Sequence, residues 1–344
     1  MKQCRKYIAL ILCLICVLSL TGCNMSDVLS GKTKIVLTTG YDKDAVFQIG
    51  TSTCSYDEFM IYLTNTQNRY ESVYGDDIWN VSSGEVTLEQ KIKDSVAFKL
   101  AQVKTLNLLA SQYGVSLSEE DYRKIDTMTN SYMSSLTPVE VEKLNITSEF
   151  IHTMYEEYVL AHVVYAYIIR DINPEISDDE ARTVSVEWIR FNALDGDYKV
   201  QNNAQNVWVR IQNGEDFDTL AQTFSDDVLM SHAIDKKYAD PAIRAVAFNL
   251  GEGEVSNVIT GIDGFYILRC VSTLDRVQTD ENKLKIVEER KNEAFNEVYE
   301  TFAQEQIKKL YKDVWDGITL IHDPAIQTSS FFDIYDSNYS DEAN

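Results

Sequence analysis

Histidine and the common catalytic motifs are scarce in this 344-residue sequence. It contains four histidines, and one of them, His152, lies four residues before Glu156, the spacing of two ligands on one helix face. Two groups do not make a metal site, and a solvated helix pair explains them better. The motifs H-E-x-x-H and G-x-S-x-G and the phosphate-binding loop are absent. We therefore expect neither a metal nor a cofactor.

Basic residues are scarce as well. The sequence has 31 Lys and Arg against 54 Asp and Glu, which gives a formal net charge of −23. A chain this acidic is repelled by phosphate backbones and by anionic lipid. The balance excludes nucleic acid as a partner and excludes a membrane attachment made by the protein surface itself.

The apolar run near the N-terminus is too short for a stable membrane span. Basic residues precede it, and it covers residues 7–20. It ends in Leu20-Thr21-Gly22-Cys23, which resembles the lipobox of bacterial lipoproteins. The resemblance implies a signal peptide at 1–22 and a lipid on Cys23 that anchors the chain to the extracytoplasmic face of a bacterial cell membrane. An ordinary signal peptide with a chance cysteine is the alternative.

Cysteine is rare in the body of the chain. Four of the six cysteines lie at or before position 23, so only Cys54 and Cys270 remain. These two either form one disulfide or stay as unpaired, half-buried thiols. The sequence alone leaves both interpretations open.

Hydrophobic periodicity divides the remaining chain. Residues 23–45 are predicted to be a tether, and two short strands are expected at 35–39 and 45–49. In residues 46–180, apolar side chains recur at spacings of three, four and seven, which indicates helices. Helix N-caps are predicted at Ser55, Ser118 and Thr147, and a helix end at Gly114. The period changes in residues 181–275, where two strands, at 185–193 and 265–271, enclose helices. This section predicts a compact α+β domain.

The C-terminal section returns to the helical period. Residues 276–322 carry one long apolar seam, which needs a partner that only the first helical section is large enough to supply. We therefore expect an α+β protein in which N-terminal helices and a returning C-terminal helix form a body that carries an inserted α+β domain. Residues 323–344 are polar and are predicted to be disordered.

Three separated motifs follow one another in the α+β section. The first is G-E-D-F-D-T-L-A with F-S-D-D, over 214–227; the second is A-F-N-L-G-E-G-E-V-S, over 247–256; the third is G-F-Y-I, over 264–267. They resemble the signature of the parvulin family of peptidyl-prolyl isomerases. The flanking helices and the lipobox resemble bacterial extracytoplasmic foldases of the PrsA and SurA type, which implies a helical chaperone body.

The resemblance implies an active site whose polar network is reduced. Asp227 matches the Cys or Asp position of the family. The two histidines of the family fall at Trp188 and Tyr266, which cannot reproduce a pair of linked imidazoles. Ile243 and Phe248 match positions of the apolar cup that holds the proline ring. Asp227 and Tyr266 are therefore the catalytic candidates, with Trp188, Ile243 and Phe248 binding substrate.

Two positions near this site have more than one interpretation. The Tyr266 hydroxyl either reaches Asp227 and preserves a weaker network, or Tyr266 is a packed strand aromatic in a domain that has lost catalysis. The glycine-rich stretch of the family is replaced by a shorter loop at 230–238. His232 in that loop either compensates for the missing histidines or is a solvated loop residue, which is the interpretation we favour.

The resemblance implies a membrane-anchored foldase that acts on unfolded secreted polypeptides, with weak prolyl isomerase activity. An X-Pro bond has a rotation barrier of about 18–20 kcal/mol and nearly balanced end states, so its isomerisation needs no nucleophile, metal or cofactor. A non-catalytic holdase chaperone is the alternative. A solute-binding lipoprotein would need two α/β lobes, and the long helices argue against it. A homodimer is left open.

Overall fold

The computed structural model describes residues 35–37, 44–83, 86–193, 197–227 and 231–339. The predicted signal peptide, Cys23 and most of the predicted tether lie outside these residues. The chain divides into two units, and each is considered by itself. The helical unit comprises Met1–Arg170 and Ala294–Asn344, and the α+β unit comprises Asp171–Glu293. In the part of the chain that is described, no helix has the length and apolarity to span a membrane.

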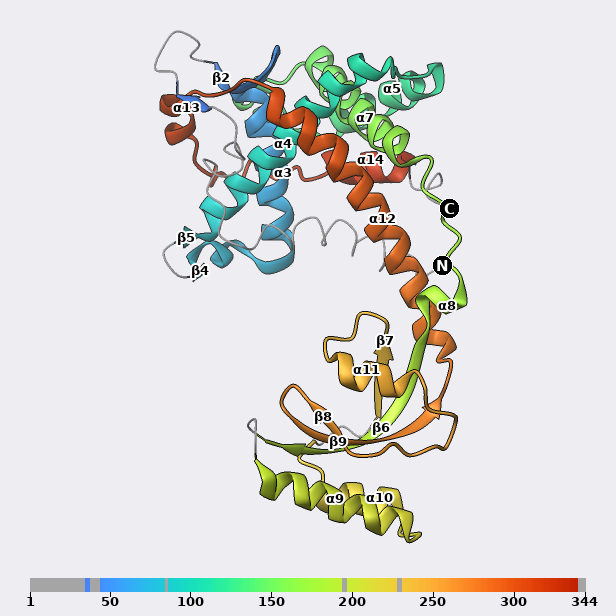
Figure 1. Ribbon diagram of the computed structural model, residues 1–344. Coiled ribbons are helices and arrows are strands. Elements are labelled where there is room, and N and C mark those ends of the chain that lie inside the picture. The colour runs from blue at the N-terminus through green and yellow to red at the C-terminus, as the bar shows by residue number, and fades with distance from the viewer. Residues whose placement is uncertain (1–34, 38–43, 84–85, 194–196, 228–230, 340–344) are drawn as a thin grey trace. The chain divides into compact units, whose positions relative to one another are not determined.

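In the described residues up to Arg170, the helical unit contains five α-helices (Figure 1). They are α3 (Tyr56–Tyr74), α4 (Leu88–Tyr113), α5 (Glu119–Ser135), α6 (Pro138–Lys143) and α7 (Ser148–Ile169). Each begins after a Ser or Thr whose side chain accepts a hydrogen bond from the first turn. The predicted caps Ser55, Ser118 and Thr147 are confirmed, and so is Gly114, which ends α4 in the left-handed conformation. A short 3-10 helix, η1 (Asp76–Asn80), and a hairpin of β4 (Ser82–Ser83) and β5 (Val86–Thr87) connect α3 to α4.

Within the helical unit, a small sheet pairs three N-terminal strands with one strand from the C-terminal section of the chain. Its order is β1-β10-β2-β3, made of β1 (Ile35–Leu37), β10 (Lys308–Leu310), β2 (Ala45–Ile49) and β3 (Ser52–Ser55). The short strand expected at 45–49 is confirmed as β2, and the one expected at 35–39 is confirmed over β1. The predicted tether boundary at 45 is therefore wrong for β1 and for the first residue of β2.

The prediction of one continuous C-terminal helix over 276–322 is also wrong. Helix α12 (Arg276–Glu305) ends before β10, and α13 (Lys312–Gly317) follows it. The main chain of 308–310 pairs with both β1 and β2, and this tertiary pairing overrides the helical period of the sequence. The predicted return is confirmed, because Phe295, Leu310 and Trp315 lie in the same core as the N-terminal helices.

The predicted disorder of 323–344 is wrong for the residues up to Tyr339. Residues 318–330 lack regular structure, and α14 (Phe331–Tyr339) follows them. Phe331 is fully buried in the core of the helical unit, and Phe332 and Tyr335 are buried beside it. The average polarity of the segment predicted disorder, but a few buried aromatic residues are enough to hold it against the core.

Three ionisable side chains are packed inside the helical unit. The Lys104 ammonium lies 2.9 Å from the Glu58 carboxylate and 2.5 Å from that of Glu157. Glu58 and Lys104 are almost completely buried. Burial, partly offset by Lys104, raises the pKa of Glu58 to about 7. Burial alone would lower the pKa of Lys104, but the two carboxylates outweigh it and raise that pKa.

The α+β unit is built on a four-stranded antiparallel sheet of order β7-β6-β9-β8. The strands are β6 (Thr183–Asn192), β7 (Ser231–Asp235), β8 (Ile259–Gly261) and β9 (Gly264–Ser272). Helices α9 (Tyr198–Gln212) and α10 (Phe217–Phe224) lie on one face, and α11 (Pro241–Ala247) lies on the other (Figure 1). The short α8 (Asp178–Ala181) precedes β6. The two predicted strands are confirmed as β6 and β9, whereas β7 and β8 were not predicted.

The two faces of this sheet bury different sets of side chains. Ile189 and Ile267 belong to the cluster covered by α9 and α10, and Val186 and Leu268 belong to the cluster on the α11 face. At the turn before β9, a Cβ atom on Gly264 would lie 2.2 Å from the carbonyl oxygen of Phe191. Glycine is required there because the two main chains are in contact.

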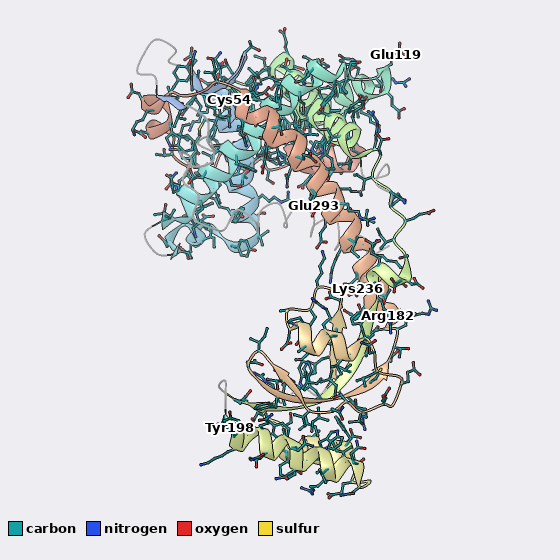
Figure 2. All side chains as sticks on the ribbon, in the orientation of Figure 1. Cys54, Glu119, Arg182, Tyr198, Lys236 and Glu293 are labelled. Carbon is teal, nitrogen blue, oxygen red and sulfur yellow. The ribbon has the colours of Figure 1, made fainter. Side chains whose placement is uncertain are left out.

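The two thiols in the described chain are unpaired. Cys54 and Cys270 are both free and buried, and they lie in different units. Of the two interpretations of these cysteines, the unpaired one is correct. At the surface of the α+β unit, Tyr198 projects outward at the start of α9 with 76% of its surface exposed (Figure 2).

Candidate functional site

Strands β6 and β9 place two of the predicted residues next to each other on the α11 face. Trp188 pairs with Leu268, and Arg190 pairs with Tyr266, in an antiparallel register. The Trp188 and Tyr266 rings meet edge to face, with centroids 5.3 Å apart. Both side chains are buried. The two positions that the sequence resemblance assigns to family histidines thus hold a packed aromatic pair.

Asp227 reaches the same place from the segment after α10. The Ser225 hydroxyl accepts hydrogen bonds from the main-chain N–H groups of Arg190 and Asp227, at 3.2 Å each, and so fixes this segment against β6. The indole N–H of Trp188 donates to Oδ2 of Asp227 at 2.9 Å. Asp227 and Trp188 are therefore brought together as predicted, with the carboxylate as acceptor.

His232 completes this group from strand β7. Its ring stacks on Trp188 with centroids 3.4 Å apart and an interplanar angle of 19°. Its Nε2 lies 3.5 Å from Oδ2 of Asp227. The favoured interpretation of His232 as a solvated loop residue is wrong: the residue pairs with Val186 inside the sheet, and 17% of its side chain is exposed.

Sequence reasoning undervalued His232 because it treated residues 230–238 as a loop. The signal that was available is the alternation of His232 with Ile234, which is fully buried on the same strand. A period of two over Ser231–Asp235 would have placed both side chains on the face that carries Trp188.

The Tyr266 hydroxyl takes a different partner from the one considered. It donates to Oδ1 of Asp263 at 2.5 Å, and the guanidinium of Arg190 donates to Oδ2 of the same carboxylate at 2.5 Å. Burial and the Asp263 carboxylate raise the pKa of Tyr266, so the phenol stays neutral. The interpretation in which Tyr266 bonds to Asp227 is wrong, and Asp263 and Arg190 are the members of the site that the sequence did not reveal.

The two predicted cup residues lie on and just after α11. Ile243 is buried in the cluster that contains Trp188 and Tyr266, while Phe248 is half-buried at its margin. The guanidinium of Arg182 lies 5.2 Å from the centre of the Phe248 ring. Both residues are thus on the face of the sheet that carries Asp227, Ile243 as core and Phe248 as an accessible ring.

Helix α11 is fixed to the β8–β9 turn through one carboxylate. Oδ1 of Asp240 accepts hydrogen bonds from the N–H groups of Ala242 and Ile243, and Oδ2 accepts from that of Ile262 at 2.7 Å. The Ile262 side chain beyond it is 74% exposed. An apolar side chain is therefore held at the rim of this face by a rigid turn.

The chemistry available on this face is limited to hydrogen bonding and apolar contact. Asp227 accepts from Trp188 and lies beside His232, whereas the Tyr266 hydroxyl donates to Asp263. Among the described residues, no group of three or more His, Cys, Asp or Glu side chains is arranged to hold a metal ion. On α7, Nδ1 of His152 lies 3.5 Å from Oε1 of Glu156.

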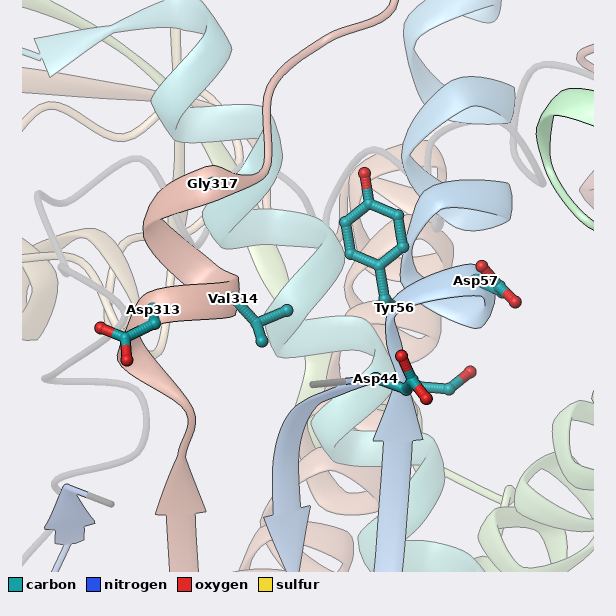
Figure 3. Close-up of a pocket in the computed structure, with 7 residues that line it drawn as sticks. Asp44, Tyr56, Asp57, Asp313, Val314 and Gly317 are labelled. Atoms are coloured by element: carbon teal, nitrogen blue, oxygen red, sulfur yellow. The ribbon is translucent and has the colours of Figure 1, made fainter. Parts of the chain in front are cut away.

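Two hollows elsewhere belong to the helical unit. One, of about 330 Å³, lies where α13 approaches the start of α3 and is lined by Tyr56, Val314 and three aspartates (Figure 3). The other, of about 460 Å³, lies between α6 and the segment before α14. Neither coincides with the group around Asp227.

Comparison with known families decides what the α+β unit is. Residues 189–272 match the family described as "Rotamase: PPIC-type PPIASE domain". The α+β unit contains a parvulin-type domain. The match covers the Tyr266 strand and the Asp227 segment, and it starts one residue after Trp188.

Whole-chain relatives agree with this parvulin-type assignment. The chain is 20% identical to the foldase protein PrsA of Clostridium tetani, over 90% of this chain and 97% of the relative. It is 24% identical to the foldase protein PrsA of Oceanobacillus iheyensis, over 77% of this chain and 85% of the relative. The crystal structure of PrsA from Bacillus cereus aligns over 85% of this chain and 98% of its own, with 14% identity and a TM-score of 0.36. The predicted resemblance to parvulin-domain foldases of the PrsA and SurA type is confirmed.

Proposed function

We propose that this chain is an extracytoplasmic foldase that binds unfolded exported polypeptides and isomerises prolyl bonds in them at a low rate. The parvulin-type domain and the PrsA relatives support this function. A lipid on Cys23 would hold the foldase at the membrane. Metabolic labelling with a radioactive fatty acid tests the anchor, since the label should disappear in Cys23→Ser.

The observation that carries the isomerase proposal is the contact of Asp227 with Trp188 and His232. A prolyl peptide that lies on this face exchanges water for the accessible ring of Phe248 and the exposed side chain of Ile262 at the rim. Loss of water around the amide favours the twisted bond, in which the charge separation of the planar amide is lost. The Asp227 carboxylate and the His232 imidazole then supply the polar contacts that discriminate twisted from planar geometry.

The same geometry accounts for a low rate. One imidazole lies beside Asp227, and it comes from β7 rather than from the two strand positions used in the family. Trp188 occupies one of those positions and already donates its N–H to Asp227. Tyr266 occupies the other and directs its hydroxyl to Asp263. Fewer groups are therefore free to respond to the twisting amide.

A refolding reaction limited by proline isomerisation tests the proposal. The chain, at a concentration far below that of the refolding protein, should accelerate the slow phase, and the double variant Asp227→Ala/His232→Ala should lose about tenfold of that acceleration. His152→Ala, which changes a half-exposed histidine in the other unit, is the matched control. Equal acceleration by the double variant and the control would remove this group from the mechanism.

A holdase without catalysis is the second candidate. The burial of Trp188 and Tyr266 as a packed pair favours it. In that case the wild-type chain suppresses aggregation of an unfolded protein at equimolar concentration and leaves the slow refolding phase unchanged at catalytic concentration. The same assay thus separates the two candidates.

A further inference from the structure

The segment before α14 is held in an unusual way for a connection inside a folded unit. Residues 318–330 form no helix or strand, and side chains of the helices bond to their main chain. The Gln67 amide donates to the carbonyl oxygen of Ile321 at 2.9 Å and accepts from its N–H at 3.1 Å. One glutamine side chain on α3 therefore forms hydrogen bonds with both the N–H and the carbonyl oxygen of Ile321.

The same pattern continues along the segment. Oε1 of Glu140 accepts hydrogen bonds from the N–H groups of Gln327 and Thr328, at 2.8 and 2.7 Å. The amide of Asn68 donates to the carbonyl oxygen of Thr328 at 2.9 Å. Three more pairings with main-chain groups thus come from α3 and α6, and none of them depends on which side chains the segment carries.

An aromatic cage holds the end of the segment. Phe331 is fully buried and stacks on Tyr155 with centroids 4.3 Å apart and an interplanar angle of 3°. Tyr62 and Tyr132 contact the same ring at 5.3 and 5.4 Å. The Phe331 N–H donates to Oδ1 of Asn65, and its carbonyl oxygen accepts from the Tyr155 hydroxyl. The cage therefore contacts the ring of Phe331 and also bonds to the N–H and carbonyl groups of the same residue.

The segment does not fill the space available to it. A hollow of about 460 Å³ lies between the α5–α6 connection and residues 324–330. Most of the side chains that the segment presents there are small: Ala325, Thr328, Ser329 and Ser330. A chain with larger side chains at these positions would gain apolar contact that the present occupant lacks.

We propose that this channel is a binding site for extended client segments that carry an aromatic residue, and that residues 321–331 are its intramolecular occupant. The channel is defined by Asn65, Gln67, Asn68, Glu140 and Tyr155. Main-chain N–H and carbonyl groups are common to all polypeptides. A site that forms hydrogen bonds with these groups, and that holds one aromatic side chain in an apolar cage, therefore binds many different sequences. The inference rests on the proposed foldase function and names the place where the helical unit would hold its clients.

Competition between the occupant and a client sets the apparent affinity. A tethered segment acts at an effective concentration in the millimolar range, and a client binds only the fraction of molecules whose channel is open. A change that weakens the occupant and leaves the channel intact must therefore strengthen client binding. A change that locks the occupant must abolish it.

The geometry offers such a lock. The hydroxyl oxygens of Ser135 on α5 and Ser330 are 3.0 Å apart, so cysteines at both positions lie within reach of a disulfide. The test uses the full chain with Ser135→Cys/Ser330→Cys and with the four cysteines at or before position 23 replaced by serine. The probe is a fluorescent peptide with the sequence of residues 321–332, and binding is followed by anisotropy with and without reductant.

We expect the oxidised form to bind the peptide at least about tenfold more weakly than the reduced form. For the same chain without the two new cysteines, the affinity for the peptide should not change when reductant is added. Equal affinity of the oxidised and reduced forms would overturn the proposal, because the occupant would then not compete with the peptide.

A second variant acts on the occupant alone. Phe331→Ala empties the cage without changing a channel residue and should tighten peptide binding by about tenfold. Asp333→Ala, on the same helix with 58% of its side chain exposed, is the control. A lower melting temperature of Phe331→Ala without any gain in peptide affinity would mean that the segment is only a structural element.

An unfolded, reduced and carboxymethylated protein separates this inference from the foldase proposal. Equal binding of that protein by the locked and open forms defeats the channel and leaves the foldase proposal standing. Failure of every form to bind it, with peptide binding still sensitive to the lock, defeats the foldase proposal and leaves the channel.

Discussion

The two units differ in what they offer to a polypeptide. The α+β unit presents a small face on which Asp227 and His232 remain 18% and 17% exposed beside a packed aromatic pair. The helical unit holds an extended segment of its own chain through side chains that bond to its main chain. In the functions proposed above, binding of a chain and isomerisation of its prolyl bonds depend on separate groups. The absence of imidazoles at Trp188 and Tyr266 should then weaken isomerisation without affecting binding.

The units also differ in how they bury charge. The helical unit encloses Lys104 between Glu58 and Glu157. In the α+β unit, the ion pair of Arg269 with Glu187 keeps about a quarter of each side chain exposed. Stability of the helical unit thus depends on complete pairing of buried charge, whereas the α+β unit tolerates the loss of a pair.

Removal of Lys104 should have the largest effect. Lys104→Ala leaves the buried Glu58 carboxylate and the partly exposed Glu157 carboxylate without their counter-ion. The variant should lower the free energy of unfolding of the helical unit by about 3–5 kcal/mol. Chemical denaturation followed by circular dichroism measures the change. Lys312→Ala, which removes an exposed pair with Asp316, should change stability by less than about 1 kcal/mol. Similar losses in the two variants would contradict the assigned role of the buried pair.

The second prediction concerns pH. The pKa of Glu58 is raised to about 7 in the folded chain from 4.5. A raised pKa contributes stability that is fully present below pH 4.5 and is lost as the pH rises through 7. The helical unit should therefore lose about 2 kcal/mol between pH 5 and pH 8 from this group. Glu58→Gln, which stays neutral and faces the same Lys104 and Glu157, should flatten the dependence; an unchanged slope would show that other groups cause it.

The third prediction restores an imidazole in the α+β unit. Trp188→His places a histidine beside Asp227 at the position that the parvulin family uses, and should raise the isomerase rate by about tenfold. A coupled assay with a prolyl peptide measures it. Trp208 belongs to the cluster on the other face of the sheet, with α9 and α10, so Trp208→His is the matched control and should give no gain. A rate below that of the wild type would mean that the indole itself supports the site.

The smallest effect is expected from a substitution at Tyr266 on β9. Tyr266→Phe removes one hydroxyl that donates to Asp263, whose side chain is 56% exposed and can turn to water. The loss of stability should be about 1 kcal/mol or less, with little change in isomerase rate. Thermal unfolding and the peptide assay check both values. A large loss of rate would return Tyr266 to the catalytic group.

The sequence predicted the elements whose signals are local. Helix caps such as Ser118 and the strand around Ile267 depend on neighbouring residues, and both appear as expected. Strand β10 was missed because its pairing with β1 and β2 joins residues more than 250 positions apart. Helix α14 was missed because three aromatic residues outweigh a polar surrounding.

The site followed the same rule. Asp227, Trp188 and Tyr266 could be assigned because the motifs fix their places on strands and turns. His232 could not, because its contact with Asp227 depends on the β6–β7 register. Asp263 was missed because Asp227 was the one hydrogen-bond partner considered for the Tyr266 hydroxyl. Side-chain partners depend on which strands pair and in which register, and a single sequence does not determine either.

The pairing of β10 with β1 gives synthesis and export an order. A polypeptide leaves the ribosome from its N-terminus, so the strand at 35–37 waits for a neighbour that is made some 270 residues later. The inserted α+β unit, by contrast, is contiguous and has all its strands before position 273. It can therefore fold first, whereas the β1–β10 pairing of the helical unit must wait until residues 308–310 have been made.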